Sequence, residues 1–234
     1  MKFKYLIGNS YDPYWNLALE EALFEYINRD ISIIYLWQND KTIVIGKNQN
    51  VEAECFANEF LNFGGKIARR KSGGGAVYHD KGNLNFSIIC LKEVKQVYSY
   101  EKLICKVMAE LQVPTEYNGR NDILTNGKKF SGNAEYDDGR IVCQHGTILV
   151  SSNIEMMRRY LTPSVSKLQR NHISSVESRV INLSMVSNVT IEDIKDKWIE
   201  IMDAEKLEYL PEKFKIENKM KFYSDPKWIY GGMK

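Results

Sequence analysis

The stretch "RRKSGGGAVYHDKGNLNFS", which runs from Arg69 to Ser87, places three consecutive glycines between two arginines and a His-Asp pair. Glycine has no Cβ, so the backbone at positions 73 to 75 can approach a ligand closely and direct successive N–H groups at an anion. Arg69 and Arg70 supply planar, charged donors suited to phosphate or carboxylate, and Ser72 adds a hydroxyl. A simple tight turn is the alternative, and the charged neighbours favour an anion site.

The glycine run is not one of the common nucleotide motifs, because no Gly-Lys-Ser/Thr closes it and it does not read GxGxxG. A second polar segment follows at Asn126-Gly127, which predicts a type I′ hairpin turn. The next two residues, Lys128 and Lys129, point to opposite faces of a strand, so at most one can face inward. Asp122, just before the hairpin, is a candidate Mg²⁺ ligand, since magnesium bound with phosphates often uses one carboxylate.

The composition is that of an ordinary globular protein, with 234 residues, 44% hydrophobic and 26% charged. A formal charge of +2 gives no field of the kind that holds nucleic acid, so we expect no nucleic-acid partner. Cys55, Cys90, Cys105 and Cys143 have no metal-binding spacing and are expected to be reduced and mostly buried. Without a signal peptide or a long apolar run, the sequence predicts a cytoplasmic protein with no membrane partner.

Hydrophobic periodicity predicts the elements of the first half of the chain. Asp12-Pro13 predicts a helix start, and an amphipathic helix follows to about Asn28. The other predicted elements are a strand at Phe3–Ile7, a hairpin of two strands at Ser32–Trp37 and Thr42–Gly46, a helix at Asn50–Phe63, and strands on both sides of the glycines, with Asn83–Leu91 continuing the same sheet.

The second half is predicted to add strands around Asn126-Gly127 and at Arg140–Val150, and helices at Val97–Leu111 and Asn153–Tyr160. Residues 162–178 are polar and poorly periodic, which predicts a long loop that can act as a lid. Thr190 is the expected N-cap of a last helix, of which Ile191, Ile194, Trp198 and Ile201 form one face.

Several blocks of the chain resemble the lipoate protein ligases. The glycine stretch is similar to their glycine-loop signature, and other blocks match in the right order over about residues 1–185: "DPYWNLALEEALF", "LWQNDKTIVIGKNQN", "GRNDILTNGKKFSGNA", "QHGTILV" and "SSVESRVINL". The resemblance implies an α+β fold of mixed, mostly antiparallel β-sheets packed with helices, of the biotin/lipoate protein ligase catalytic-domain type. We expect residues 1–234 to form one such domain.

The resemblance also implies an activity. The family's enzymes use ATP and Mg²⁺ to activate lipoic acid as lipoyl adenylate, then pass the lipoyl group to a lysine of an acceptor, either a lipoyl domain of a 2-oxoacid dehydrogenase or the glycine cleavage H protein. The implied catalytic residue is Lys129, and Asp122 is the implied metal ligand. The implied ATP and adenylate residues are Arg70, Ser72, Gly73, Gly74, Gly75, Ala76, Val77, Tyr78, Asn83, Asn121, Asp122 and Lys129. The implied lipoate residues are Trp37, Arg70, Ser72, Gly74, His79, Lys129, His145 and Thr147.

One feature departs from the family pattern. Bacterial ligases of this kind carry a small accessory domain after a "W.YGK"-like stretch, whereas this sequence stops at "DPKWIYGGMK". We expect the last helical segment, about residues 190–234, to lead to an accessory domain that is absent or a separate polypeptide. If that domain is needed for activation, this chain alone is expected to use lipoyl adenylate but to make it poorly.

Other functions stay open. Related octanoyl and lipoyl transferases use a cysteine thiolate, but residues 113–129 and 151–167 contain no cysteine, and Cys143 lies in a strand where burial is common. The main alternative is a transferase of lipoyl or octanoyl groups that needs no cysteine, or a transferase that uses lipoyl adenylate but activates lipoate poorly without an accessory domain. Biotin protein ligase and a non-catalytic lipoate binder follow. His79 and His145 have no zinc-binding spacing, and ordinary hydrogen-bonded strand histidines are their alternative interpretation.

Overall fold

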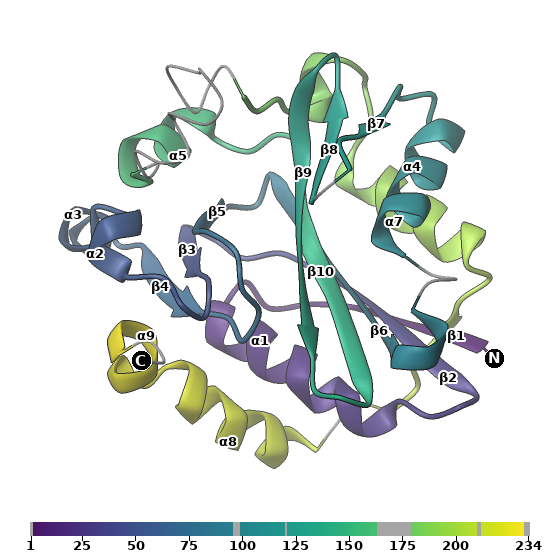
Figure 1. Cartoon of the computed structure of the whole chain (residues 1–234), viewed down its shortest axis with the longest axis horizontal. Coiled ribbons are helices and arrows are strands. Elements are labelled where there is room, and N and C mark those ends of the chain that lie inside the picture. The colour runs from purple at the N-terminus through teal and green to yellow at the C-terminus, as the bar shows by residue number, and fades with distance from the viewer. Residues whose placement is uncertain (1, 96–98, 120, 163–178, 210–211, 232–234) are drawn as a thin grey trace.

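The computed structural model describes residues 2–95, 99–119, 121–162, 179–209 and 212–231. The strands form an eight-stranded sheet in the order β11-β1-β2-β6-β10-β9-β8-β7 and a three-stranded sheet in the order β4-β3-β5 (Figure 1). β1 is parallel to β2 and to β11, and β3 is parallel to β4, while the other neighbours are antiparallel. The predicted α+β class with mixed, mostly antiparallel sheets is therefore confirmed.

The bounds of the elements are as follows. The large sheet contains β1 (Lys2–Ile7), β2 (Ile31–Trp37), β6 (Asn83–Leu91), β7 (Glu116–Tyr117), β8 (Asp122–Thr125), β9 (Lys128–Asp137), β10 (Ile141–Leu149) and β11 (Glu205–Lys206). The small sheet contains β3 (Thr42–Ile45), β4 (Lys66–Arg69) and β5 (Val77–His79). The helices are α1 (Pro13–Ala22), α2 (Val51–Glu54), α3 (Ala57–Asn62), α4 (Tyr100–Glu110), α5 (Ile154–Tyr160), α7 (Ile191–Ile201), α8 (Lys213–Tyr223) and α9 (Pro226–Gly231), with short 3-10 turns at Leu23–Tyr26, Lys92–Val94 and Leu183–Met185.

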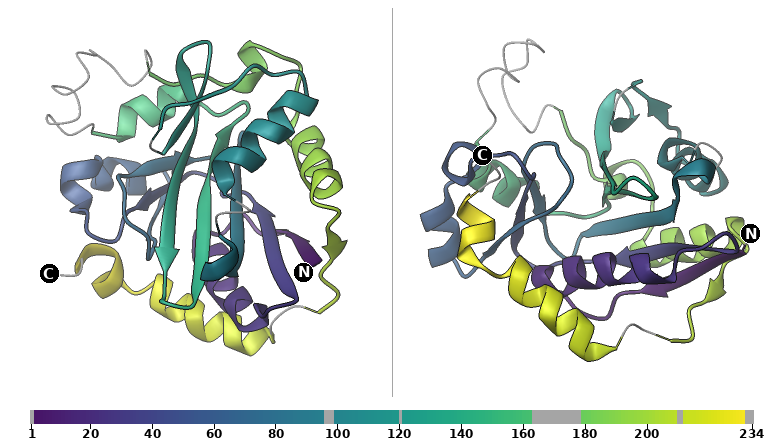
Figure 2. Two further views of the ribbon diagram at one scale, coloured as in Figure 1. Left: turned by 45° about the vertical axis from the view of Figure 1, so that its right-hand side comes forward. Right: turned by 60° about the horizontal axis from the view of Figure 1, so that its bottom comes forward.

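Helix α1 begins where the sequence predicts it. The Asp12 side chain accepts hydrogen bonds from the backbone N–H groups of Tyr14 and Trp15, and Pro13 occupies the first turn. The helix connects β1 to the parallel strand β2, as a parallel pair requires a crossover. It packs on one face of the large sheet, and α8 lies alongside it (Figure 2).

The large sheet has a hydrophobic core on each face. One core joins Phe86 and Ile148 of the sheet to Trp198 of α7 and Val107 of α4. The opposite face packs against α1 and α8, and this second core includes Tyr35 and Trp37. A third core lies between the small sheet and helices α2, α3, α5 and α9. The small sheet thus stands beside the face that bears α1 (Figure 1).

The predicted hairpin at Ser32–Trp37 and Thr42–Gly46 is wrong. β2 pairs with β1 and β6 in the large sheet, whereas β3 pairs with β4 and β5 in the small one. The loop between β2 and β3 passes from one sheet to the other. In this loop the buried Asn39 side chain accepts a hydrogen bond from the Asn16 side chain of α1 and contacts the His79 ring of β5. The strand–loop–strand prediction around the glycines is confirmed, but β6 belongs to the large sheet and does not continue the sheet of β4 and β5.

Three predicted helices differ from the structure in their limits. The first, expected to run from Asp12-Pro13 to about Asn28, ends as α1 at Ala22 and continues only as a 3-10 turn at Leu23–Tyr26. The helix expected at Asn50–Phe63 is split into α2 and α3, because Cys55 is extended and forms a bridge with Leu161. The helix expected from Val97 is described from Tyr100. Thr190 caps α7 through a reciprocal bond with Asp193, as predicted, but α7 is not the last helix, since α8 and α9 follow it.

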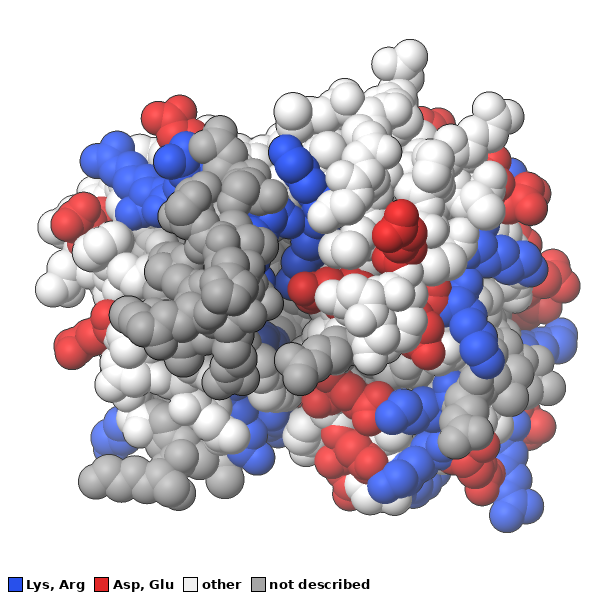
Figure 3. Space-filling model, turned by 45° about the horizontal axis from the view of Figure 1, so that its top comes forward, with Lys and Arg blue, Asp and Glu red and all other residues white. Residues whose placement is uncertain are grey.

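Other predictions fall outside the described residues or concern the surface. The proposed lid at 162–178 lies outside them except for Thr162. Basic and acidic side chains are mixed on the face shown in Figure 3. None of the helices in the described ranges combines the length and apolar character needed to cross a membrane.

Candidate functional site

A row of residues from five strands crosses the face of the large sheet that bears α1, called here the site face. The register pairs Trp37 with Asn85, Asn85 with Thr147, Thr147 with Gly132, and Gly132 with Asp122. Directly opposed residues point to the same side of a sheet, so these five residues share the site face. The structure therefore brings Trp37, Thr147 and Asp122, all three predicted as site residues, onto one surface.

A shift in the β8–β9 register decides where Lys129 points. Ser131 pairs with Ile123, but Lys129 pairs with Leu124, so Phe130 has no residue opposite it. An extra residue of this kind in one strand is a β-bulge, and it reverses the alternation beyond it. The bulge places the Lys129 side chain on the site face. Regular alternation along β9 from Gly132 would have placed it on the opposite face.

The Lys129 amine reaches across the site face to Asp122. Nζ of Lys129 lies 2.7 Å from Oδ1 of Asp122, and both side chains are about 30% exposed, at 31% and 27%. The amine passes so close to Gly132 that a Cβ there would lie 2.6 Å from it. Lys128 is exposed. The prediction that at most one of the two lysines faces inward is confirmed, and that lysine is Lys129.

The glycine loop, residues 72 to 76, connects β4 to β5 and lies against β10 of the large sheet. Gly74 has a φ of +92°, and a Cβ on Gly46 would lie 2.0 Å from the Gly74 carbonyl oxygen, so both positions require glycine. Gly73 and Gly74 are exposed. Among the residues that the structure describes, the N–H groups of Gly73, Gly74 and Gly75 have no acceptor. These N–H groups are available to an anion.

Arg70 fixes the conformation of the loop from inside. Its guanidinium donates to the carbonyl oxygens of Gly73 and Gly75 at 2.7 and 2.9 Å, to the Val44 carbonyl at 3.1 Å, and to the Ser72 hydroxyl at 3.0 Å. Burial lowers the pKa of Arg70 to about 10, so the guanidinium remains charged at neutral pH. In this structure Arg70 shapes the loop, and its predicted contacts with ATP and lipoate stay predictions.

Arg69 does not face the site, contrary to its proposed use as an anion donor. Its guanidinium is buried and donates to the carbonyls of the loop after β3 and of α9, namely those of Gly46, Lys47, Gln49, Trp228 and Ile229. All five acceptors are backbone oxygens, so Arg69 has a structural role.

A chain of buried polar contacts runs from the glycine loop to helix α1. Oγ of Ser72 lies 2.6 Å from Nε2 of His145, and Nδ1 of His145 lies 2.8 Å from Oε1 of Glu20. The Ser87 hydroxyl donates to the same Glu20 oxygen at 2.5 Å and accepts from the Trp37 indole at 3.0 Å. This chain brings the predicted residues Trp37, Ser72 and His145 together and places the Glu20 carboxylate in the same network as the Arg70 guanidinium.

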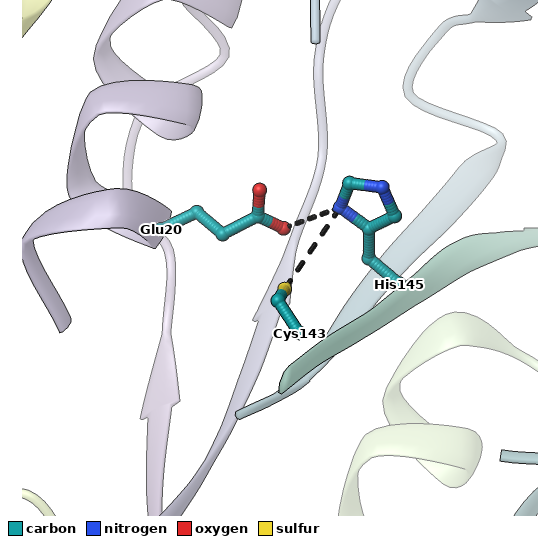
Figure 4. A group of neighbouring side chains, drawn as sticks. All are labelled: Glu20, Cys143 and His145. Atoms are coloured by element: carbon teal, nitrogen blue, oxygen red, sulfur yellow. Dashed lines mark hydrogen bonds and ion pairs between the residues drawn. The ribbon is translucent and has the colours of Figure 1, made fainter. Parts of the chain in front are cut away.

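Glu20, Cys143 and His145 converge from α1 and β10 (Figure 4). Burial raises the pKa of Glu20, but the His145 ring and the Ser87 hydroxyl outweigh it, so the pKa lies below its ordinary value and the group is a carboxylate. Burial and the Glu20 charge raise the pKa of the Cys143 thiol well above its ordinary value. A protonated, buried thiol is a poor nucleophile, which disfavours a thiolate mechanism through Cys143.

Three buried polar atoms near this network have no partner among the described residues: His79 Nε2, Asn83 Oδ1 and Asn85 Nδ2. Burial, Arg70 and His145 lower the pKa of His79 to about 3, so its ring is neutral. The ring contacts Trp37 edge-on, and Asn85 lies opposite Trp37 on the site face. Buried polar atoms are normally satisfied, so these three mark where the polar groups of a ligand can bind.

An open cleft of about 650 Å³ lies beside the glycine loop. Gly73 and Gly74 form one wall, and Asn121 and Ala134 contribute to the others. The remaining lining residues come from α4 and its approach and from strands β7, β9 and β10: Lys95, Ser99, Tyr100, Glu101, Lys102, Tyr117, Glu135 and Gln144. The structure therefore places the predicted residues Gly73, Gly74 and Asn121 around one opening. Ala76 donates its N–H to Glu54, and the Tyr78 ring packs on Phe60, so the Tyr78 side chain lies in the third core.

Sequence reasoning missed several residues of this network, above all Glu20, Glu54 and Ser87. Glu20 had a signal, because it lies four residues after the buried Asn16 and three after the buried Leu17 on α1, where a charge is costly unless paired. Glu54 and Ser87 had no comparable signal, since their partners are distant in sequence: Ala76 for Glu54, and Glu20 and Trp37 for Ser87.

A scan against known families matches residues 12–203 to the lipoyl protein ligase A/B catalytic domain. The chain belongs to this family. "Lipoate-protein ligase A" of Blochmanniella floridana is 37% identical over 190 residues, which cover 79% of the chain and 56% of that protein. "Probable lipoate-protein ligase A" of Mycoplasma pneumoniae is 42% identical over 177 residues, 73% of the chain and 52% of that protein. The chain spans about half the length of these curated relatives.

Solved structures share the family fold over the whole chain. LipL1 of P. falciparum, in complex with lipoate, has a TM-score of 0.80 and 27% identity, covering 99% of the chain and 75% of that protein. A bi-partite lipoate protein ligase of Thermoplasma acidophilum, described with its E2 lipoyl domain, has a TM-score of 0.82 and 23% identity. The match covers 100% of the chain and 97% of that protein. A lipoate-protein ligase A bound with ATP also scores 0.82 at 23% identity, with full coverage of both chains. The predicted fold type is confirmed.

Proposed function

We propose that the chain binds ATP and lipoate, joins them as lipoyl adenylate, and transfers the lipoyl group to a lysine of an acceptor lipoyl domain. Membership of the lipoyl protein ligase family supports this proposal, as do the relatives named lipoate-protein ligase A and the ATP-bound and lipoate-bound structures. The observation that carries it is the exposed glycine loop, whose three N–H groups lack acceptors among the described residues while Arg70 holds their conformation.

The first half-reaction brings two anions together. The lipoate carboxylate attacks the α-phosphate of ATP, a P–O bond forms, and pyrophosphate leaves. Negative charge accumulates on the phosphate oxygens, and preorganised donors reduce the barrier because they need no reorganisation. The N–H groups of Gly73, Gly74 and Gly75 are such donors, and the Lys129 ammonium supplies a cation that can leave Asp122 to contact both anions.

Lipoate is an acyl chain with an apolar ring at one end and a carboxylate at the other. The buried Trp37 ring, stacked on Tyr35 at 5.7 Å, offers an apolar wall for the chain. The neutral His79 ring and Nδ2 of Asn85, which has no partner among the described residues, lie beside that wall and can hydrogen-bond uncharged ligand atoms. His145 and Thr147 continue the same face toward Gly132, and therefore toward Lys129.

The donor set fits a magnesium ion that is bound mainly through nucleotide phosphates. Asp122 provides one half-buried carboxylate, which is what such ions commonly take from a protein. When bound, Mg²⁺ neutralises phosphate charge. Asp122 is then the residue that holds it, and the release of Lys129 from Asp122 is the protein's own contribution to the same step.

The second half-reaction needs no covalent enzyme intermediate, because the mixed anhydride reacts directly with an amine. The acceptor lysine attacks the lipoyl carbonyl, an amide forms, and AMP leaves. The open cleft beside Gly73 and Gly74 offers an approach for that lysine. The E2 lipoyl domain described with the Thermoplasma ligase supports lipoyl domains as the acceptor class. The glycine cleavage H protein is the second acceptor that we propose to test.

The test is the mass of a purified apo lipoyl domain after incubation with the chain, ATP, Mg²⁺ and lipoate. The proposal expects the mass gain of one lipoyl group, dependent on ATP, and the same gain from synthetic lipoyl adenylate without ATP. A gain from lipoyl adenylate alone would instead assign the chain to the lipoyl-adenylate-using transferases, and a gain only from an acylated donor protein would assign it to the ATP-independent ones. No gain under any condition would leave a binding protein. Each assay is run with and without a separate accessory domain from a two-domain relative.

A further inference from the structure

Side chains of successive residues before the glycine loop point to two different places. Arg70 and Ser72 face the buried polar network of the site. Arg69 and Lys71, which alternate with them, contact the C-terminal segment formed by α8 and α9. The strand that leads into the loop is therefore held on one side by the site and on the other by residues more than 140 positions away along the chain.

Arg69 and Trp228 are joined by hydrogen bonds in both directions. Nε of Arg69 donates to the carbonyls of Trp228 and Ile229 at 3.0 and 2.9 Å, and Nη2 donates to Ile229 at 2.6 Å. In return the Trp228 indole N–H donates to the Arg69 carbonyl at 2.9 Å. Both the side chain and the backbone of Arg69 are thus fixed by α9, one residue before Arg70.

Lys71 is tied to the same segment through Glu21 of α1. Its Nζ lies 2.7 Å from Oε2 of Glu21 and over the Phe222 ring at 5.4 Å from the centroid. Glu21 also accepts from the Lys219 amine at 3.0 Å and from the Tyr223 hydroxyl at 2.8 Å. Burial raises the pKa of Glu21, but the hydrogen bonds from Lys71, Lys219 and Tyr223 outweigh burial, so this pKa lies below its ordinary value.

The contacts of Arg69 also extend to the back of the glycine loop. Its Nη1 donates to the Gly46, Lys47 and Gln49 carbonyls at 2.8, 3.0 and 2.8 Å. The Lys47 N–H in turn donates to the Ser72 carbonyl at 2.9 Å, and Gly46 packs directly on Gly74. A displacement of α9 would therefore reach the loop by two routes, through the strand and through the turn behind it.

We propose that the α8–α9 segment is a positioning element of the adenylate-forming site and that Trp228 is its principal positioning residue. The family match ends at residue 203, so the segment lies outside the part of the chain that the family model describes. The expected effect on ATP kinetics rests on the proposed function. The expected effect on the loop conformation rests only on the contacts of Arg69. Trp228 acts through Arg69 on the loop whose N–H groups are to receive the nucleotide.

The kinetic consequence is selective. The loop N–H groups are proposed for the nucleotide, whereas Trp37 and His79, which form the wall proposed for lipoate, lie on β2 and β5. Among the described residues, no hydrogen bond or ring contact joins Trp37 or His79 to α9. In Trp228→Phe, which keeps an aromatic ring but lacks the N–H donor, kcat/KM for ATP in lipoate-dependent ATP–pyrophosphate exchange is expected to fall about fivefold. The KM for lipoate is expected to change less than about twofold.

The experiment pairs kinetics with amide hydrogen exchange of the full chain. Tyr223→Phe is a second, milder variant that removes the bond to Glu21, and Tyr230→Phe, which alters an exposed residue of α9, is the matched control. In Trp228→Phe the amides of Lys47 and Arg70, which bond to Ser72 and Ile45, are expected to exchange faster, while those of the β6–β10 ladder do not change.

Equal exchange at Lys47 and Arg70 in all variants would overturn the inference, as would losses in ATP and lipoate parameters that merely follow the melting temperature. If the wild-type chain shows no pyrophosphate exchange, the proposed function fails, and hydrogen exchange still decides the positioning role. If Trp228→Phe does not fold, Tyr223→Phe carries the same comparison.

Discussion

Nζ of Lys129 lies 2.7 Å from Oδ1 of Asp122, so the residue proposed for catalysis and the residue proposed for the metal form an ion pair. Pairs that are about one-third exposed contribute little to stability, on the order of 0 to 1 kcal/mol. The pair can therefore open at low cost when two anionic reactants and a cation enter. The ion pair with Asp122 keeps the Lys129 charge in the site and avoids the cost of an unpaired, partly buried ammonium group.

Replacing Lys129 by alanine tests this arrangement. Lys129→Ala is expected to lower the rate of lipoate-dependent ATP–pyrophosphate exchange by about 10²- to 10³-fold, because a charge that stabilises the transition state is lost. The melting temperature is expected to stay within a few degrees of the wild-type value. Lys128→Ala, on the opposite side of the strand, is the matched control and should leave both quantities unchanged. Retention of more than about a tenth of the rate in Lys129→Ala would remove Lys129 from the mechanism.

The close approach of Gly46 and Gly74 makes a second prediction. A Cβ on Gly46 would lie 2.0 Å from the Gly74 carbonyl oxygen, so Gly46→Ala must displace the loop. We expect a loss of about 2 to 4 kcal/mol in unfolding free energy and loss of measurable ATP binding by calorimetry. A Cβ on Gly73 would meet nothing within 4 Å, so Gly73→Ala should unfold like the wild type. Equal stability of the two variants would show that the loop does not pack as described.

The buried Glu20 carboxylate predicts a dependence of stability on pH. Its pKa in the folded chain lies below its ordinary value, so ionised Glu20 stabilises the fold above the unfolded pKa, about 4.3, and this contribution is lost as pH falls through the folded value. Glu20→Gln lacks the charge that offsets Arg70 and is expected to be less stable by about 1 to 3 kcal/mol near neutral pH. Denaturant unfolding across the acidic range should show the difference shrinking below about pH 4. A difference independent of pH would mean that the carboxylate is not ionised in the fold.

The four cysteines are predicted to differ in reactivity. Burial raises the pKa of Cys55 and of Cys90 to about 11, and burial and the Glu20 charge raise that of Cys143 well above its ordinary value, whereas Cys105 is half-buried on α4. With a disulfide reagent near pH 8, Cys105 should react first and the other three only on unfolding. Cys105→Ser should remove the fast phase. A fast phase that persists in Cys105→Ser but disappears in Cys143→Ser would reopen a thiolate mechanism.

Two helix caps and one hairpin turn were predictable because their sequence signals are local. The Asp12-Pro13 cap, the Thr190 cap and the Asn126-Gly127 turn all occur as expected, and Asn126 and Gly127 have φ values of +50° and +70°. Sheet membership was not predictable in the same way. Two adjacent buried strands such as β2 and β3 fit a hairpin equally well, and their separation follows from pairing with strands that are distant in sequence. Asn39, bonded to Asn16 and His79, lies in the connection between them.

The candidate site was predicted in part. The loop, Lys129 and Asp122 were recognised from their motifs, but the bulge at Phe130 that turns Lys129 onto the site face leaves no mark in the sequence. The sequence does not distinguish the two adjacent arginines. Their side chains point in opposite directions, so Arg70 binds the glycine loop and Arg69 binds α9. Such assignments depend on long-range contacts, which a linear pattern does not encode.

The central claim is that the glycine N–H groups and the Lys129 ammonium together compensate the charge of a forming acyl adenylate. Its most direct test is mass spectrometry of the chain after incubation with ATP, Mg²⁺ and lipoate, with no acceptor present. We expect lipoyl adenylate bound to the wild-type chain and to Lys128→Ala, and none on Lys129→Ala. Lipoyl adenylate formed equally by Lys129→Ala, or a chain that binds both substrates and never forms it even with the accessory domain supplied, would contradict the account.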